Sequence, residues 1–287
     1  MAISRILVPL SGGEAGLPCV ETAFLLGRRF QAHVEAMHAR RNPRESLAYV
    51  GEGMTGAMIE EIIAAAEREG EALAHRARED FETLCRRYQP DPAEKAAPGR
   101  FSTSLRVEEG REAELVARRG RLADLIVVGR ASKNSEAPSP ATVEAALLET
   151  GRPIVVTPPD AVSSLEGTAV IAWNGSAEAA RATACALPLL TQASQVVVLT
   201  ISEGAGAGPD EADLVGYLAA HGVAATTRAT AASFASVGES LLAEARSLDA
   251  SLIVMGAYTH SRLHQIIMGG ATRHVLTASE LPLLMAH

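Results

Sequence analysis

The sequence predicts an α/β protein made of two tandem, doubly wound domains, each with a five-stranded parallel sheet. Three observations support this prediction. The 287 residues suit two domains of ordinary size. A strand-like segment recurs in each half of the chain. The strand candidates are continuous apolar runs separated by helical patterns, as expected for parallel sheets that helices cover on both faces.

The internal repeat is clearest at the fourth strand of each half. The segment ADLIVVG at 123–129 corresponds to ASLIVMG at 250–256. Each is followed by an Ala-Thr pair that opens a helix-like segment, and then by an apolar strand that begins with proline. Because such self-similarity marks duplicated structural units, we expect one domain over residues 1–160 and a second over residues 161–287.

Strand candidates alternate with helical patterns along both halves. The longest helical pattern covers 55–88 and is interrupted by Gly70, whereas its counterpart at 210–221 is much shorter. Alternation of this kind implies right-handed crossovers, with ligands at the carboxyl ends of the strands where the strand order reverses. The expected strands are 3–10, 32–38, 101–107, 124–129 and 153–157 in the first half, and 168–173, 195–201, 225–231, 251–256 and 282–286 in the second.

The charge distribution argues against nucleic-acid and membrane partners. The formal net charge is −8, and from Asp160 onward eleven acidic residues face five arginines and no lysine. A nucleic-acid-binding surface would need the opposite excess. No apolar stretch approaches the length of a membrane span, and the first ten residues lack the features of an export signal. We therefore expect a cytoplasmic protein.

A glycine-bracketed loop follows the fourth strand of the second half. Gly256 lets the chain leave the strand sharply, and Gly269-Gly270 precedes a helix that begins near Ala271-Thr272. The free N–H groups and the dipole of a helix N-terminus favour phosphate. A Gly pair before a helix is also typical of an ordinary tight turn.

The spacing of this loop resembles the universal stress protein signature, Gly-x2-Gly-x9-Gly-(Ser/Thr). The resemblance covers nearly the whole chain, twice. It implies a Rossmann-like fold of the adenine nucleotide alpha hydrolase type and, in the nucleotide-binding branch, ATP or AMP, with Mg, at the strand ends. By position, the resemblance assigns base, ribose and phosphate contacts to Ala172, Trp173, Asn174, Ile201, Met255, Gly256, Thr259, Gly269, Gly270, Ala271 and Thr272.

The sequence departs from the signature at three positions of the second copy. Thr259 replaces its second Gly, Gly270 replaces its Ser or Thr, and Asn174 stands where nucleotide binders carry Asp. The first copy departs further, because Ser139-Pro140 occupies the place of the Gly pair and proline has no N–H to offer. Ser11 also stands where Asp is expected. We expect nucleotide binding in the second copy and none in the first.

Other chemistries have less support from the residues. His260, His264 and His274 lie in or beside the loop, which leaves open a metal site or ordinary solvated side chains. There is no Gly-x-Ser-x-Gly elbow and no Gly-x4-Gly-Lys-(Ser/Thr) loop. We assign no catalytic residue, and enzymatic activity stays open only as slow ATP hydrolysis.

The function expected from the resemblance is a stress-response role in which the second copy binds ATP or AMP without catalysis. The alternatives are an interaction protein of the same fold that binds no nucleotide, and a weak ATPase. Two such sheets commonly pack through their last strands. We therefore expect self-association as a dimer, or pairing of 153–157 with 282–286 within one chain.

Overall fold

The structure is a computed structural model that describes most of the chain. The described residues are 2–13, 16–43, 55–130, 139–160, 162, 164–202, 209–232, 236–257 and 270–287.

The two halves of the chain repeat one order of strands and helices. In the first half these are β1 (Arg5–Pro9), α1 (Leu17–Phe30), β2 (His33–Arg40), α2 (Gly56–Tyr88), β3 (Asp91–Pro92), β4 (Ser102–Glu109), α3 (Glu112–Gly120), β5 (Leu125–Gly129), α4 (Pro140–Leu148) and β6 (Ile154–Thr157). In the second half they are β7 (Thr168–Ala172), α5 (Ala177–Leu190), β8 (Gln195–Ser202), α6 (Glu211–Ala220), β9 (Thr226–Ala231), α7 (Val237–Ser247), β10 (Ala250–Gly256), α8 (Gly270–Ala278) and β11 (Leu283–Ala286).

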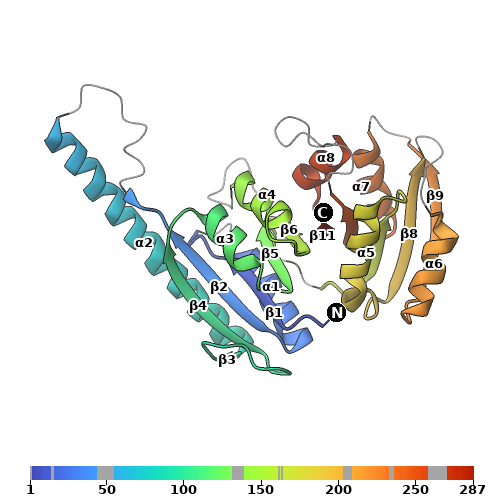
Figure 1. Cartoon of the computed structure of the whole chain (residues 1–287), viewed down its shortest axis with the longest axis horizontal. Helices are drawn as coiled ribbons and strands as arrows, with labels where there is room; N and C mark the ends of the chain where they lie inside the picture. Colours follow the sequence, from blue (N-terminus) through green and yellow to red (C-terminus); the bar gives the residue numbers. More distant parts are fainter. Residues whose placement is uncertain are drawn as a thin grey trace.

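All strands join one 11-stranded sheet in the order β3-β4-β2-β1-β5-β6-β11-β10-β7-β8-β9 (Figure 1). Neighbouring strands are parallel except at the centre, where β6 and β11 pair antiparallel with Val155 opposite Leu284. The strand order reverses between β1 and β5 in the first half, and between β7 and β10 in the second. The expected doubly wound fold is therefore present, and the predicted pairing of the last strands within one chain is confirmed.

Helices cover both faces of the sheet. Apolar side chains of α1, α2, α5 and α6 pack into one core cluster, while those of α3, α4, α7 and α8 pack into a second cluster on the other face. The central strands, such as β5, β6 and β11, are buried on both sides, which explains why they appear in the sequence as uninterrupted apolar runs, whereas the edge strand β9 is mostly exposed.

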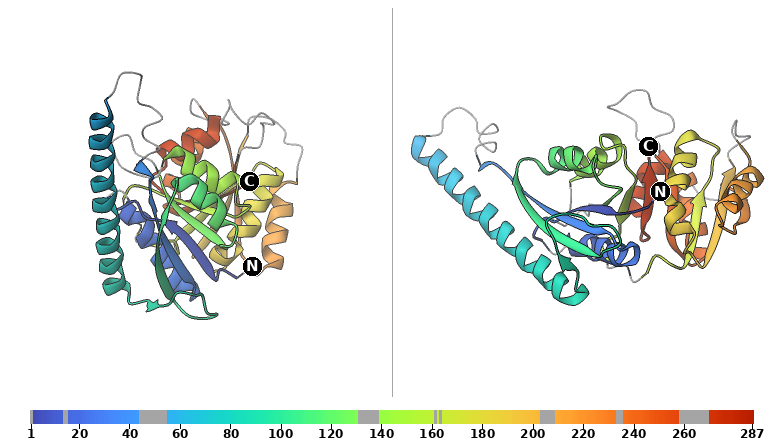
Figure 2. Two further views of the ribbon diagram at one scale, coloured as in Figure 1. Left: turned by 60° about the vertical axis from the view of Figure 1, so that its left-hand side comes forward. Right: turned by 60° about the horizontal axis from the view of Figure 1, so that its bottom comes forward.

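The long helix α2 confirms the helix expected over 55–88. It is continuous from Gly56 to Tyr88 (Figure 2), although Gly70 interrupts the pattern of residues. A glycine inside a helix costs only about 1 kcal/mol relative to alanine, which a long flanking helical pattern outweighs. Thr55 caps the helix by accepting a hydrogen bond from the Met58 N–H at 3.4 Å.

The ten expected strands are all present, with ends shifted by at most a few residues. The structure adds the two-residue strand β3, which pairs with β4 at the sheet edge. The sequence pattern could not predict β3, because Asp91 and Pro92 form no apolar run. Proline is tolerated there since an edge strand leaves one side of its backbone unpaired.

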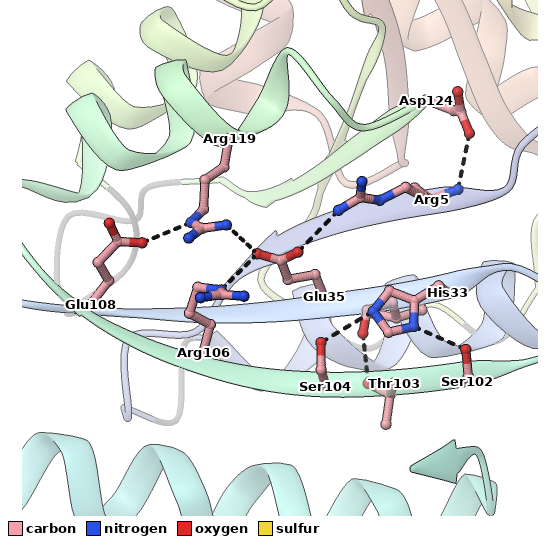
Figure 3. Close-up of polar contacts among 11 residues, drawn as sticks. Arg5, His33, Glu35, Ser102, Thr103, Ser104, Arg106, Glu108, Arg119 and Asp124 are labelled. Atoms are coloured by element: carbon pink, nitrogen blue, oxygen red, sulfur yellow. Dashed lines mark hydrogen bonds and ion pairs between the residues drawn. The ribbon is translucent and has the colours of Figure 1, made fainter. Parts of the chain in front are cut away.

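A charged network stabilises the first half away from the strand ends (Figure 3). The Glu35 carboxylate on β2 lies 3.1–3.4 Å from three guanidinium groups, which come from β1, β4 and α3. One of these, Arg119, also donates to Glu108 at 2.8 Å. The network joins four elements and includes none of the predicted site residues. The three guanidinium groups are those of Arg5, Arg106 and Arg119.

Candidate functional site

The candidate site lies where β7 and β10 separate at their carboxyl ends. Ala172 is opposite Met255 on β10 and opposite Leu199 on β8, so β7 and β10 end side by side while β8 continues to Ser202. Met255 is buried and Ala172 half-buried. The structure therefore brings Ala172, Met255 and Gly256 together, as the resemblance implies.

Gly256 is required by a close approach of the sheet to α5. A Cβ atom at this position would lie 2.5 Å from the Ala179 backbone nitrogen and 2.6 Å from the Glu178 carbonyl carbon. Both are backbone atoms of the first turn of α5 and cannot move independently of the helix. The glycine thus sets the α5 N-terminus directly beside the end of β10.

Asn174 is exposed at the end of β7, where it also shapes the chain that enters α5. Its Oδ1 accepts a hydrogen bond from the Ser176 N–H at 3.1 Å, and the Ser176 hydroxyl then caps α5 by accepting from the Ala179 N–H at 3.2 Å. The Asn174 amide N–H groups remain exposed donors for a ligand. Gly175 adopts φ +73° between these two residues, a conformation that glycine permits at little cost.

Trp173 does not present an open aromatic face to the candidate site, because its ring is buried. Only 6% of the residue is exposed, and it belongs to the core cluster on the α5 and α6 side. Its indole N–H donates to the Pro209 carbonyl at 3.0 Å, and its backbone N–H donates to the Leu199 carbonyl at 2.9 Å. The ring therefore anchors the start of α6 against the end of β7.

The helix α8 supplies the other side of the candidate site. It begins at Gly270, which is exposed and around which a Cβ atom would meet no atom within 4 Å. Ala271 is half-buried and Thr272 is 8% exposed. Ala271 and His274 pack closely on Gly238 of α7, so α7 fixes the direction of α8.

The other predicted residues either lie outside the described part of the chain or lie apart from the end of β10. Thr259, Gly269, His260 and His264 lie outside the described residues. Ile201 is half-buried on β8, two strands away from β10. His274 lies on α8, and no cluster of three metal-ligating side chains occurs within the described part of the chain.

The corresponding region of the first copy is covered by α2. Leu10 donates its backbone N–H to Met37 as Trp173 does to Leu199, so Ser11 corresponds to Asn174 and Gly12 to Gly175. Gly12 has φ +78°, and a Cβ atom there would overlap the Leu73 carbonyl oxygen of α2. The Ser11 hydroxyl oxygen is buried and has no partner among the described residues. The strand end that is exposed in the second copy is thus enclosed in the first.

A carboxylate already occupies the N-terminal turn of α4, which is the first copy's counterpart of α8. Glu112, the first residue of α3, accepts a hydrogen bond from the Thr142 hydroxyl at 2.8 Å. Burial raises the pKa of the Glu112 carboxyl, and the Thr142 hydrogen bond and nearby Arg41 oppose that rise. The N-terminal residue of α7 at the same place in the second copy is Val237. In the sequence, the only signal of Glu112 is its position at the start of a helix that follows a strand.

Comparison with known proteins identifies the fold. No protein-family profile and no curated protein matches the sequence. Among solved structures, a universal stress protein from Archaeoglobus fulgidus DSM 4304 superposes with a TM-score of 0.63 at 16% identity, over 98% of this chain and 97% of that chain. The chain has the universal stress protein fold. The resemblance seen in the sequence is therefore confirmed at the level of fold.

Two Pseudomonas aeruginosa structures are similar to this universal stress protein fold over nearly their whole length. A putative universal stress protein from strain UCBPP-PA14 has a TM-score of 0.53 at 15% identity, covering 99% of this chain and 93% of that chain. A functionally unknown protein from strain PAO1 has a TM-score of 0.54 at 14% identity, covering 99% and 92%. The likeness thus extends across both copies. Within the described residues, no helix is both long and apolar enough to span a membrane.

Proposed function

We propose that the chain is a stress-response protein that binds ATP or AMP through its second copy, in a regulatory and non-catalytic role. The observation that carries this proposal is the contrast between α4 and α8. The N-terminal turn of α4 is hydrogen-bonded to the protein's own Glu112 carboxylate, whereas α8 begins at an exposed glycine with open space around it. A helix N-terminus of the second kind can receive a phosphate.

The remaining groups of the site suit a nucleotide. Backbone N–H groups at Gly270, Ala271 and Thr272 would hold the phosphates, and the exposed amide of Asn174 would donate to a ribose hydroxyl or to the base. Met255 offers an apolar contact at the end of β10. Asn174 carries no charge, so the site supplies no carboxylate at this position for a Mg ion that accompanies ATP.

The first test is to identify small molecules released when the purified full-length protein is denatured. Mass spectrometry is expected to find ATP, ADP or AMP at about one per chain, and titration calorimetry should give one site. Two equivalent sites would contradict the assignment of binding to the second copy alone. Absence of a nucleotide, with no rise in Tm on adding millimolar ATP, would favour the interaction protein that binds none.

A matched pair of substitutions at Gly270 locates the site. Gly270→Asp places a carboxylate in open space at the start of α8, where it favours the helix through its dipole but repels a phosphate. We expect ATP affinity to fall about tenfold or more, because like charges a few ångströms apart at a protein surface repel by more than ~1 kcal/mol. Gly270→Asn has the same shape without the charge and should bind within about threefold of wild type. Unchanged affinity in Gly270→Asp would place the phosphates elsewhere, and equal losses in both variants would mean that the bulk of the side chain rather than its charge weakens binding.

The weak-ATPase alternative is separated by following phosphate release. A nucleotide that co-purifies intact and is not hydrolysed over hours supports the regulatory role. Steady release of phosphate that Gly270→Asp abolishes would instead favour the ATPase.

A further inference from the structure

One side chain of the first copy reaches the helix to which the phosphate-binding role is assigned in the second copy. Arg130 directly follows β5, and its backbone N–H donates to the Thr157 carbonyl at 2.9 Å, which fixes its position at the strand end. Its Nη1 crosses between the copies and donates to the Thr277 carbonyl in the last turn of α8. The residue is half-buried, and its Nε atom is buried with no partner among the described residues.

The last turn of α8 lacks a cation of its own. The final carbonyls of a helix have no intrahelical partners, and a positive charge beside them stabilises the helix through its dipole. Helices α1, α2 and α3 each carry two arginines in their last turn, whereas α8 carries no basic residue there. Arg130 therefore supplies, from the other copy, the charge that α8 lacks.

The described residues of the second copy include no equivalent of the Arg130 contact with α8. Ala257 holds the position in the second copy that Arg130 holds in the first, since its backbone N–H donates to the Ala286 carbonyl at 3.0 Å as Arg130 does to Thr157. An alanine side chain cannot donate a hydrogen bond to the end of α4. Among the described residues, the pseudosymmetry of the two copies is thus broken, because the first copy contacts the end of α8 through Arg130 and Ala257 makes no equivalent contact with α4.

We propose that Arg130 is a positioning residue through which the first copy stabilises α8 and strengthens anion binding at Gly270–Thr272. The part that concerns anion binding rests on the proposed function. A cation at the C-terminus of α8 and a phosphate at its N-terminus both interact favourably with the same helix dipole. Arg130 also holds the helix in the direction that presents its N–H groups.

The experiment compares Arg130→Gln with Arg152→Gln in the full-length protein. Glutamine keeps a hydrogen-bond donor but removes the charge. Arg152 is the matched control, because its guanidinium also donates to a backbone carbonyl at a helix end, that of Arg121 at 2.9 Å, but within the first copy. Hydrogen exchange of residues 271–279 is measured without nucleotide, and ATP affinity is measured by calorimetry at low salt.

Arg130→Gln is expected to accelerate exchange in α8 about two- to fivefold and to weaken ATP binding by a similar factor, the size of a helix-end charge effect. Arg152→Gln should change neither. Adding Thr277→Arg to Arg130→Gln places a cation in the last turn of α8 itself, at an exposed position, and should restore the slow exchange.

Unchanged exchange in Arg130→Gln, an equal change in Arg152→Gln, or no rescue by Thr277→Arg would overturn the support of α8 by charge. Faster exchange with unaltered ATP affinity would overturn the role in anion binding. If wild type binds no ATP but the exchange differences are found, the proposed function fails while the support of α8 by Arg130 stands.

Discussion

The two copies build the same five-strand order and differ in what lies over the carboxyl ends of their strands. In the first copy, α2 packs onto Gly12 and the Glu112 carboxylate is hydrogen-bonded to the first turn of α4. In the second copy, Asn174 and Gly270 are exposed at the equivalent places. A duplicated fold can therefore retain its sheet while only one copy keeps an accessible strand end.

The difference between the copies lies in helices rather than in strands. The two copies meet where β6 pairs with β11, and we call this pairing the β6–β11 seam. Both strands are buried, so the loss of either strand would expose the last strand of the other copy. The helix after the second strand is under no such constraint: it is α2 in the first copy and the much shorter α6 in the second. A change in the length of this helix can therefore cover or uncover the strand ends without disturbing the sheet.

Separation of the copies should have the largest effect. Expressed alone, residues 1–160 or 161–287 would expose an apolar edge strand, β6 or β11, and such edges pair with other chains. We expect both fragments to aggregate, and co-expression to recover a soluble complex, measured by size-exclusion chromatography. Two soluble monomeric fragments would show that each copy is stable without the seam.

Gly12→Ala should cost about 2–5 kcal/mol. The left-handed backbone conformation disfavours any Cβ by about 1–2 kcal/mol, and the overlap with the Leu73 carbonyl adds a similar or larger penalty. Gly151→Ala is the control, because Gly151 has φ +68° with no atom within 4 Å of a Cβ, and it should lose only the conformational part. Urea denaturation measures both variants. Equal losses would mean that α2 does not press on the strand end.

Ser176→Ala should cost about 1 kcal/mol, because the Ser176 hydroxyl caps α5. The first copy has Gly16 at the equivalent cap, with no side-chain hydrogen bond. Ser176→Gly is therefore expected to lose only a few tenths of a kcal/mol, since glycine is tolerated at this position. A thermal-unfolding series that ranks glycine below alanine would contradict this order.

The strands and most helices were predictable, whereas the asymmetry of the sites was predictable only in part. Apolar runs such as LIVVG at 125–129 reflect burial on both faces, which is a local property of the sequence. The absence of a Gly pair at Ser139-Pro140 also predicted that the first copy binds no nucleotide. The contact of Gly12 with Leu73 joins residues far apart in the chain, and no periodicity reveals it.

Charged residues of the candidate sites were the least predictable. Glu112 has the appearance of an ordinary acidic residue in a first helical turn, where such residues are common. Arg130 directly follows a strand of the first copy, yet in the structure its Nη1 donates to the Thr277 carbonyl of the second copy. Whether a charge serves its own copy or the other depends on the β6–β11 seam, which only the fold reveals.

The pH dependence of Glu112→Gln sharpens the contrast at the helix N-termini. Burial raises the pKa of Glu112 above its ordinary value of 4.5, so the folded state binds the carboxyl proton more tightly than the unfolded chain does. The stabilising contribution is therefore complete below pH 4.5 and is lost as the pH rises through the folded pKa. Glutamine does not titrate.

The stability of Glu112→Gln relative to wild type should thus be lowest near pH 4 and increase toward pH 7, by an amount on the order of 1 kcal/mol, the scale of a single hydrogen-bonded group. Urea denaturation across this range measures the difference. A relative stability that falls with pH would mean that the ionised carboxylate is the form that the α4 N-terminus stabilises, and that α4 can still attract an anion.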